Sequence, residues 1–441
     1  MARRRPRADD RPRLSRRRGH VLARPVRRDR RVSVETLTFG CRLNTVESEV
    51  LRGHAEPGAE GRDLVVVNTC AVTAEAGRQA RKAIRRLSRE RPGAEIVVTG
   101  CGAEVERASY AAMPEVARLV GNAAKLRPAS WQSGTAPAPE DIMAVRTAEP
   151  THITTMSGHT RAFVPVQNGC DHRCTFCVIP FGRGNSRSVP LAEAVAQVRR
   201  IVEHGGCEVV LTGVDLTAYG RDLDSELSLG RLVRTILAEV PDLVRLRLSS
   251  IDSVEADAEL IAAFAEEPRL MPHVHLSLQA GDDLILKRMK RRHSRADAIR
   301  LCETLRDLRP GLVFGADLIA GFPTETEAQF ARSLDLVAEC GLTHLHVFPY
   351  SPRPDTPAAR MPAVPGDVVR ARAARLREAG AAALARHLDG EVGARRRVLT
   401  ERGDTGRTEA FSLVRFSGPV PAGEIREITV TGHDGQALLA A

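Results

Sequence analysis

Nine cysteines carry most of the metal and redox chemistry that this 441-residue sequence offers, and six of them form two groups of three. The compact group is Cys170, Cys174 and Cys177. Three residues and then two separate these thiols, so one loop can wrap three corners of a cubic iron–sulfur cluster, for which thiolates are preferred ligands. With three protein ligands, one iron stays open to bind a substrate.

A structural zinc site is the alternative for this loop, with His172 as the fourth ligand. No second pair of cysteines or histidines follows at the spacing of a zinc ribbon, which argues against zinc. The chain is also too long and too poor in cysteine for a secreted disulfide scaffold.

The second group is spread along the sequence: Cys41, Cys70 and Cys101 each follow a predicted strand directly. The carboxyl ends of parallel strands meet at one edge of a sheet, where ligands gather, so we expect these thiols to converge. Chance burial of three cysteines is the alternative. The remaining cysteines stand alone in apolar surroundings, which predicts buried small side chains; they are Cys207, Cys302 and Cys340.

The elements that must position these cysteines alternate between strand and helix patterns, which predicts an α/β protein. Residues 32–122 indicate a small parallel α/β sheet, and 123–160, with Pro, Ser and Gly, a linker. Residues 161–365 contain six strand candidates, which favour a partial (β/α)6 barrel over a complete eightfold one. These strands are Ala162–Gln167, Glu208–Leu211, Val244–Ser249, Val274–Gln279, Leu312–Ile319 and Thr343–Phe348.

The C-terminal part is predicted to be a connecting helix, 366–387, and a small antiparallel β-barrel, 388–441, whose short strands are separated by Gly and Pro. The formal charge is +10, but residues 1–31 alone hold fourteen Arg and three Asp. The rest of the chain is therefore close to neutral, and charge alone does not establish a nucleic-acid partner.

Residues 1–31 are expected to be a disordered extension, with an RNA-contacting arm and a targeting peptide as alternatives. No apolar run is long enough to cross a bilayer, and no secretory signal is evident. We therefore expect a cytoplasmic protein without membrane contact.

The compact motif, with Phe176 just before its third cysteine, resembles the signature of the radical S-adenosylmethionine (SAM) superfamily. The resemblance implies a [4Fe–4S] cluster whose open iron binds SAM and cleaves it to a 5′-deoxyadenosyl radical. Together the two triplets resemble the methylthiotransferase family, from about Val32 to the C-terminus. That resemblance implies a second [4Fe–4S] cluster on Cys41, Cys70 and Cys101, and insertion of a methylthio group at an unactivated C–H bond.

Within that family, Val347–Ser351 and Pro357–Met361 resemble the branch that modifies C2 of N6-threonylcarbamoyladenosine at position 37 of tRNA. The alternatives are N6-isopentenyladenosine in tRNA, an aspartate of a ribosomal protein, or a non-catalytic RNA-binding iron–sulfur sensor. The resemblance further implies a TRAM-like RNA-binding C-terminal domain. We also expect an electron donor such as flavodoxin or ferredoxin, and a monomeric protein.

Polar residues at the strand ends are candidate SAM contacts, each with a role in turns or barrel packing as the alternative. They are Phe176, Thr212, Gly213, Ser249, Ser277, Gln279 and Asp317. Arg183, Arg187 and Arg353 are candidates for binding a carboxylate or phosphate through the guanidinium fork. In the C-terminal domain, Arg395–Arg397 is the basic cluster, and Phe411 and Phe416 are the aromatics available for stacking on RNA bases.

Overall fold

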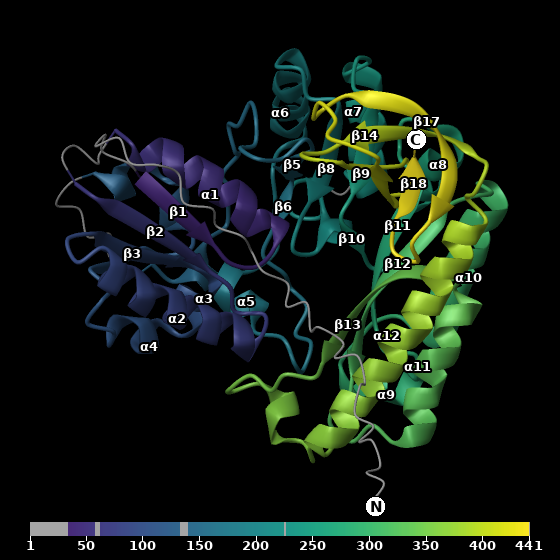
Figure 1. Ribbon diagram of the computed structural model, residues 1–441. Coiled ribbons are helices and arrows are strands. Elements are labelled where there is room, and N and C mark those ends of the chain that lie inside the picture. The colour runs from purple at the N-terminus through teal and green to yellow at the C-terminus, as the bar shows by residue number, and fades with distance from the viewer. Residues whose placement is uncertain (1–33, 58–61, 133–139, 225, 441) are drawn as a thin grey trace, which may run out of the picture.

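A computed structural model describes residues 34–57, 62–132, 140–224 and 226–440, so the Arg-rich segment 1–31 lies outside the described residues. The N-terminal domain is a parallel sheet in sequence order, drawn in purple and blue in Figure 1. Its strands are β1 (Val34–Thr38), β2 (Leu64–Thr69), β3 (Glu95–Gly100) and β4 (Arg118–Leu119). The β2 strand is buried along its whole length, which fits its run of Leu and Val in a sheet covered on both faces.

Helices cover both faces of this sheet. One face packs against α1 (Arg42–Ala55), and the other against α2 (Ala74–Glu90) and α4 (Arg107–Ala111), with the short helix α3 (Cys101–Val105) at the end of β3. Residues 123–132 belong to the same domain rather than to a linker, because Trp131 is fully buried in its core and its Nε1 donates to the Lys125 carbonyl, 2.8 Å away. Burial of one large aromatic side chain fixes this segment.

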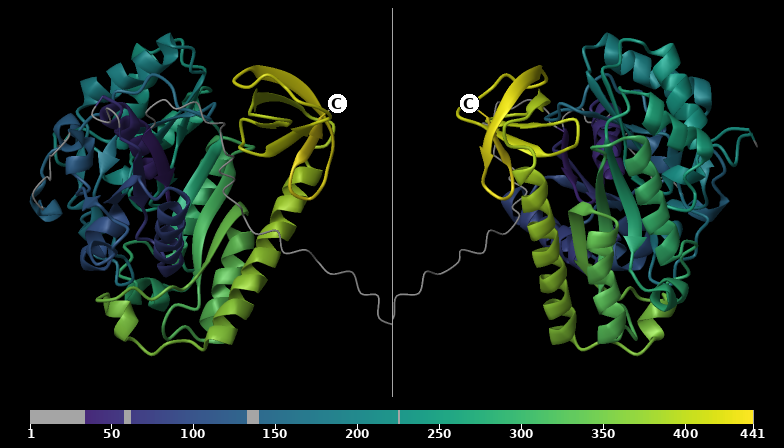
Figure 2. Two further views of the ribbon diagram at one scale, coloured as in Figure 1. Left: turned by 60° about the vertical axis from the view of Figure 1, so that its left-hand side comes forward. Right: turned by 90° about the vertical axis from the view of Figure 1, so that its right-hand side faces the viewer.

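The central domain is a partial barrel of parallel strands surrounded by helices, as predicted (Figures 1 and 2). Its strands are β5 (Ala162–Pro165), β8 (Glu208–Thr212), β9 (Arg245–Leu248), β10 (Ser250–Ile251), β11 (His273–Gln279), β12 (Val313–Ala320) and β13 (Leu342–Pro349). Its helices are α6 (Leu191–Glu203), α7 (Leu229–Glu239), α8 (Ala258–Glu266), α9 (Asp283–Arg288), α10 (Arg295–Leu308) and α11 (Glu327–Glu339). The predicted strand Val244–Ser249 ends one residue early, and the chain passes to β10 after Ser249.

Between β5 and α6 the chain forms a short excursion that carries the compact cysteine motif. It consists of the strand pair β6 (Gln167–Asn168) and β7 (Arg187–Ser188) with the helix α5 (Ile179–Arg183) between them. The carboxyl end of β5 thus leads directly into the motif.

The C-terminal part consists of the long helix α12 (Gly366–Asp389) and a closed five-stranded barrel, drawn in yellow in Figure 2. The strands are β14 (Arg395–Thr400), β15 (Thr405–Arg407), β16 (Leu413–Phe416), β17 (Ile425–His433) and β18 (Leu438–Ala440). All neighbouring pairs are antiparallel except β16 with β18. Five strands cannot alternate in direction all the way around a closed barrel, so one pair must run parallel, contrary to the strictly antiparallel prediction.

The C-terminal barrel covers the amino ends of the central strands. Arg245, which opens β9, donates to the Arg397 carbonyl at 2.7 Å, and Arg247 donates to the Thr408 carbonyl at 2.8 Å. Phe411 stacks on His273, the first residue of β11, with ring centroids 4.9 Å apart. No helix in the part of the chain that the structure describes is long and apolar enough to span a membrane.

Candidate active site

The N-terminal cysteines lie together at the carboxyl edge of their sheet. Cys41 caps α1 after β1, Cys70 follows β2, and Cys101 opens α3 after β3. Gly40 has φ 103°, and a Cβ there would approach the Cys70 Sγ to 2.8 Å, so glycine lets the loops that carry Cys41 and Cys70 come close.

The environment of these thiols fits an iron–sulfur cluster. Burial first, and then the neighbouring Cys101 and Cys41, raise the pKa of Cys70 to about 11. Such a thiol loses its proton at neutral pH when a cation such as iron takes the place of that proton. The Cys101 Sγ also accepts hydrogen bonds from the Arg183 Nε, 3.1 Å away, and the Asn122 Nδ2, 3.6 Å away, as cluster thiolates commonly do.

The compact motif lines a cavity of about 170 Å³, onto which Cys170, Cys174 and Cys177 all open. Burial raises the pKa of Cys170 and that of Cys177, the latter to about 11. Burial also opposes ionisation of Cys174, but a hydrogen bond from His172 and the charge of Arg291 outweigh it and lower the pKa of that thiol. Three thiols on one roomy cavity fit a cluster with an open iron.

The position of His172 argues against the zinc alternative. Its Nε2 lies 3.2 Å from Asp215 and 3.6 Å from Glu255. Hydrogen bonds to Cys174 and Glu255 raise the pKa of this imidazole to about 9. A zinc ion on His172 would therefore have to displace a proton that these neighbours stabilise.

The two triplets face each other across the contact between α3 and α5. Cys101 packs against Ala71 and Val178 in one small apolar cluster. A Cβ on Gly182 of α5 would stand 3.2 Å from the Cys101 Cβ. The structure therefore brings together six cysteines that are spread over more than 130 residues of sequence.

Arg183 joins the two domains instead of facing a substrate. Its side chain is 2% exposed, and its guanidinium donates to Glu47 at 2.7 and 2.9 Å, to Asn44 at 2.6 Å and to Asn168 at 3.2 Å. Together with the hydrogen bond to Cys101, these contacts occupy all three guanidinium nitrogens of Arg183. The expectation that Arg183 binds a carboxylate or phosphate of a ligand is therefore wrong.

The other two candidate arginines are also buried within the protein. Arg187 donates to the carbonyls of Arg183, at 2.7 Å, and Asn185, at 3.0 Å. Arg353 donates to Glu106 of the N-terminal domain, at 2.6 Å. Both therefore hold loops and domains in place.

Of the predicted SAM contacts, Phe176, Ser277 and Gln279 line the cysteine cavity. Thr212 is buried at the end of β8, and Gly213 packs against Gln167, beside the cavity rather than on it. The Oγ of Ser249 is buried with no hydrogen-bond partner among the described residues, and it is the next residue, Ser250, that lines the cavity.

Sequence reasoning missed several residues of this cavity, namely Asp215, Ser250, Asp252 and Arg291. Arg291 binds the Asp252 carboxylate at 2.5 Å and the Ser277 carbonyl at 2.8 Å, with its Nη1 3.7 Å from the Cys174 Sγ. The basic run Lys287–Arg292, just past a predicted strand, was the signal that could have indicated it.

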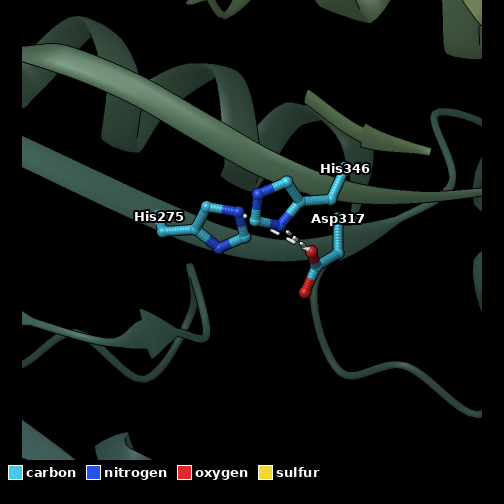
Figure 3. A group of neighbouring side chains, drawn as sticks. All are labelled: His275, Asp317 and His346. Carbon is cyan, nitrogen blue, oxygen red and sulfur yellow. Dashed lines mark hydrogen bonds and ion pairs between the residues drawn. The ribbon is translucent and has the colours of Figure 1, made fainter. Parts of the chain in front are cut away.

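Asp317 belongs to a separate group on the inner face of the barrel (Figure 3). Its Oδ1 lies 3.1 Å from the Nδ1 of His346 on β13 and 3.6 Å from the Nε2 of His275 on β11. The Nδ1 of His275 is 2.9 Å from the Ser250 Oγ. Burial lowers the pKa of His275 to about 4, so this ring is neutral.

The chain matches two family models: the radical SAM superfamily over residues 164–337, and the uncharacterized protein family UPF0004 over residues 33–121. The threonylcarbamoyladenosine tRNA methylthiotransferase MtaB of Rickettsia prowazekii is 46% identical over 90% of this chain and 94% of its own length. The tRNA-2-methylthio-N(6)-dimethylallyladenosine synthase of Sorangium cellulosum is 37% identical, over 91% and 92%.

Among solved structures, the radical SAM methyltransferase TsrM of Kitasatospora setae resembles the fold, with a TM-score of 0.50 and 17% identity over 72% of this chain and 67% of its own. One family model covers the compact cysteine motif, the other covers the three dispersed cysteines, and the MtaB relative extends along nearly all of both domains. The chain therefore belongs to the radical SAM methylthiotransferase family.

Proposed function

We propose that this protein adds a methylthio group to C2 of N6-threonylcarbamoyladenosine at position 37 of tRNA. The observation that carries the proposal is the juxtaposition of two cysteine triplets across α3 and α5, in a chain whose relatives from Rickettsia prowazekii and Thermotoga maritima bear the name of that activity. The Thermotoga relative is 33% identical over 84% of this chain and 86% of its own.

In this proposal Cys170, Cys174 and Cys177 hold the [4Fe–4S] cluster that binds SAM, and the N-terminal triplet holds the second cluster. When bound, these groups supply reductive cleavage of SAM at the first site and the sulfur to be transferred at the second. The residues of the chain position them. The carboxylates of Asp215 and Asp252 line the same cavity and suit the ammonium group of SAM.

The chain also limits access of water to the site. The buried contacts of Arg183 hold the domains together, and of the six cysteines five are buried or half-buried at this junction, whereas Cys41 is exposed. Exclusion of water protects reactive intermediates. A flavodoxin or ferredoxin as electron donor, action as a monomer and a place in the cytoplasm, where tRNA is modified, complete the proposal.

The test is anaerobic reconstitution of the protein, followed by reaction with tRNAs that carry either threonylcarbamoyl or isopentenyl at the same adenosine. Mass spectrometry of the nucleosides should find the methylthio group on the threonylcarbamoyl form and none with the Cys174→Ala variant. Preferential turnover of the isopentenyl form would reject the substrate. Methylthiolation of a ribosomal protein with neither tRNA modified would reject the substrate class.

A further inference from the structure

Arg42 is a basic residue whose guanidinium forms no ion pair within the described part of the chain, although the charge of Asp317 acts on it from farther away. It follows Cys41 and opens α1, and its side chain reaches into the barrel lumen. There it lines a cavity of about 40 Å³ whose other walls include Phe163, His275, Phe411, Arg161 and Arg247. The N-terminal domain thus contributes one guanidinium to a pocket formed by the other two domains.

The two other arginines of this cavity have anionic or carbonyl partners. Arg161 binds Glu401 at 2.8 Å, and Arg247 binds Glu208 at 2.7 Å as well as the Thr408 carbonyl. Among the described residues, the Arg42 guanidinium makes no hydrogen bond or ion pair, and its carbon lies over the Phe163 ring, 5.9 Å from the ring centroid. Arg42 is only partly buried, but it lines the cavity together with Arg161 and Arg247, so the pocket is electropositive and favours an incoming anion.

This cavity adjoins the cysteine cavity along one strand. His275 lines the Arg42 cavity, whereas Ser277, the next residue on that face of β11, lines the cysteine cavity together with Gln279, which follows an irregularity in the strand. Successive side chains on one face are about 7 Å apart. Ser250, which lines the cysteine cavity, also contacts His275 directly. A nucleobase beside the cysteines would therefore have room to extend its substituent toward Arg42.

The size and lining of the cavity define the ligand. Phe411 of the C-terminal barrel closes one wall, so the space admits the end of a substituent and not a nucleic-acid backbone. The Asp317 carboxylate (Figure 3) is a hydrogen-bond acceptor for hydroxyl or amide N–H groups, and the neutral His275 beside it carries one donor and one acceptor nitrogen. A threonylcarbamoyl group offers a carboxylate, a hydroxyl and N–H donors, whereas an isopentenyl group offers none of these.

We propose that Arg42 binds the carboxylate of the threonylcarbamoyl substituent and thereby selects this substrate against the isopentenyl one. The inference rests on the proposed function and assigns its specificity to one residue. The sequence suggested Arg183, Arg187 or Arg353 for binding a carboxylate, but their guanidinium groups bind other parts of the chain. We assign this role to Arg42 instead.

The experiment compares two proteins with two substrates. The wild type and Arg42→Gln are each given tRNA bearing threonylcarbamoyladenosine, and the same tRNA after conversion of the carboxylate to a primary amide. Kd and kcat/KM are measured for all four combinations. The wild type should prefer the carboxylate by roughly 10- to 100-fold, the value of a charged hydrogen bond. In Arg42→Gln that preference should fall to about twofold or less, and Arg42→Lys should keep part of it.

Equal preference for the carboxylate in the wild type and Arg42→Gln would overturn the inference. Arg52→Gln is the matched control, because Arg52 lies on the same helix but pairs with Glu49 and Ser157; it should keep the wild-type preference. Iron and sulfide content and the EPR spectrum check that the neighbouring Cys41 still binds its cluster. The Kd ratio needs no turnover, so it decides the question even if the iron content falls. Failure of the proposed function is distinguishable, because the wild type itself would then not modify the threonylcarbamoyl tRNA.

Discussion

At the scale of single residues, the stability of the active site depends on one buried ion cluster. Glu47 on α1 is almost fully buried and accepts hydrogen bonds from both Arg183 and Lys125, the latter at 2.5 Å. Burial alone would raise the pKa of Glu47, but these two cations outweigh it and lower the pKa to about 2. The carboxylate is therefore ionised and holds the N-terminal domain to the loop after the compact motif.

We expect Arg183→Met to destabilise the protein by about 3–5 kcal/mol, because Glu47 would keep its charge in an apolar space with one partner fewer. Denaturant unfolding under anaerobic conditions measures this. The double variant Glu47→Gln, Arg183→Met should recover part of the loss. A single variant as stable as the wild type would contradict this account.

The same cluster predicts a dependence of stability on acid. Because the pKa of Glu47 is about 2 in the folded state and about 4.3 when unfolded, its contribution is fully present above about pH 4.3. That contribution is lost as the pH falls toward 2. The free energy of unfolding of Glu47→Gln should therefore fall less between pH 5 and pH 3 than that of the wild type, as measured by denaturant titration at each pH. An equal decrease in the free energy of unfolding of the two proteins would show that other carboxyl groups determine the acid sensitivity.

The two triplets are expected to separate two half-reactions. Cys174→Ala should lose reductive cleavage of SAM, whereas Cys70→Ala should still produce 5′-deoxyadenosine but no methylthio product. Chromatography of 5′-deoxyadenosine and of tRNA nucleosides measures both. Cleavage of SAM at the wild-type rate by both variants would reject the assignment.

At the scale of elements, the sequence predicted the bounds of a helix or strand well wherever the local spacing of apolar residues determines them. The connecting helix predicted over 366–387 is α12, and each central strand lies within a few residues of its predicted range. The N-terminal cysteines were predictable because their positions at strand ends are a local signal. The partners of Arg183 were not, because Glu47 is 136 residues away, and no spacing encodes such a contact.

In the segment 123–160, too, a contact with distant residues decides the structure where local composition does not. Its composition is typical of a linker, yet Trp131 packs into the N-terminal core. We expect Trp131→Ala to cost about 3–5 kcal/mol of unfolding free energy, as for other large buried aromatics. The exposed Arg146 provides the control, and Arg146→Ala should change stability by less than about 0.5 kcal/mol. Similar effects of the two variants would support a linker after all.

At the scale of the whole molecule, the aromatic residues of the C-terminal barrel face inward. Phe411 is surrounded by His273, Arg247 and Arg407, and Phe416 packs against the core of the barrel, so neither offers a platform for stacking RNA bases. The exposed basic side chains of β14 remain as the surface for tRNA. Arg395 and Arg397 point outward, Arg395 beside Glu427 with which it forms an exposed ion pair, while Arg396 between them binds the mostly buried Glu391.

We therefore expect Arg395→Ala with Arg397→Ala to weaken tRNA affinity and to lower the slope of log K against log salt by roughly 0.7–0.9 for Arg397 and by less for Arg395, which already pairs with Glu427. Filter binding at several salt concentrations measures this slope. Arg396→Ala, whose guanidinium is already paired, should leave the slope nearly unchanged. An unaltered slope in the double variant would place the tRNA on another face.

The contact between Glu47 and Arg183 also has a consequence for how the protein is made. A ribosome adds about 5–20 residues per second, so Arg183 is joined to the chain roughly 7–27 s after Glu47. During that interval the N-terminal sheet, which is synthesised first, has no α5 against it. Cys101, which α5 later covers, then remains open to the solvent. Synthesis in this order leaves Cys101 accessible to iron and sulfide until α5 covers it.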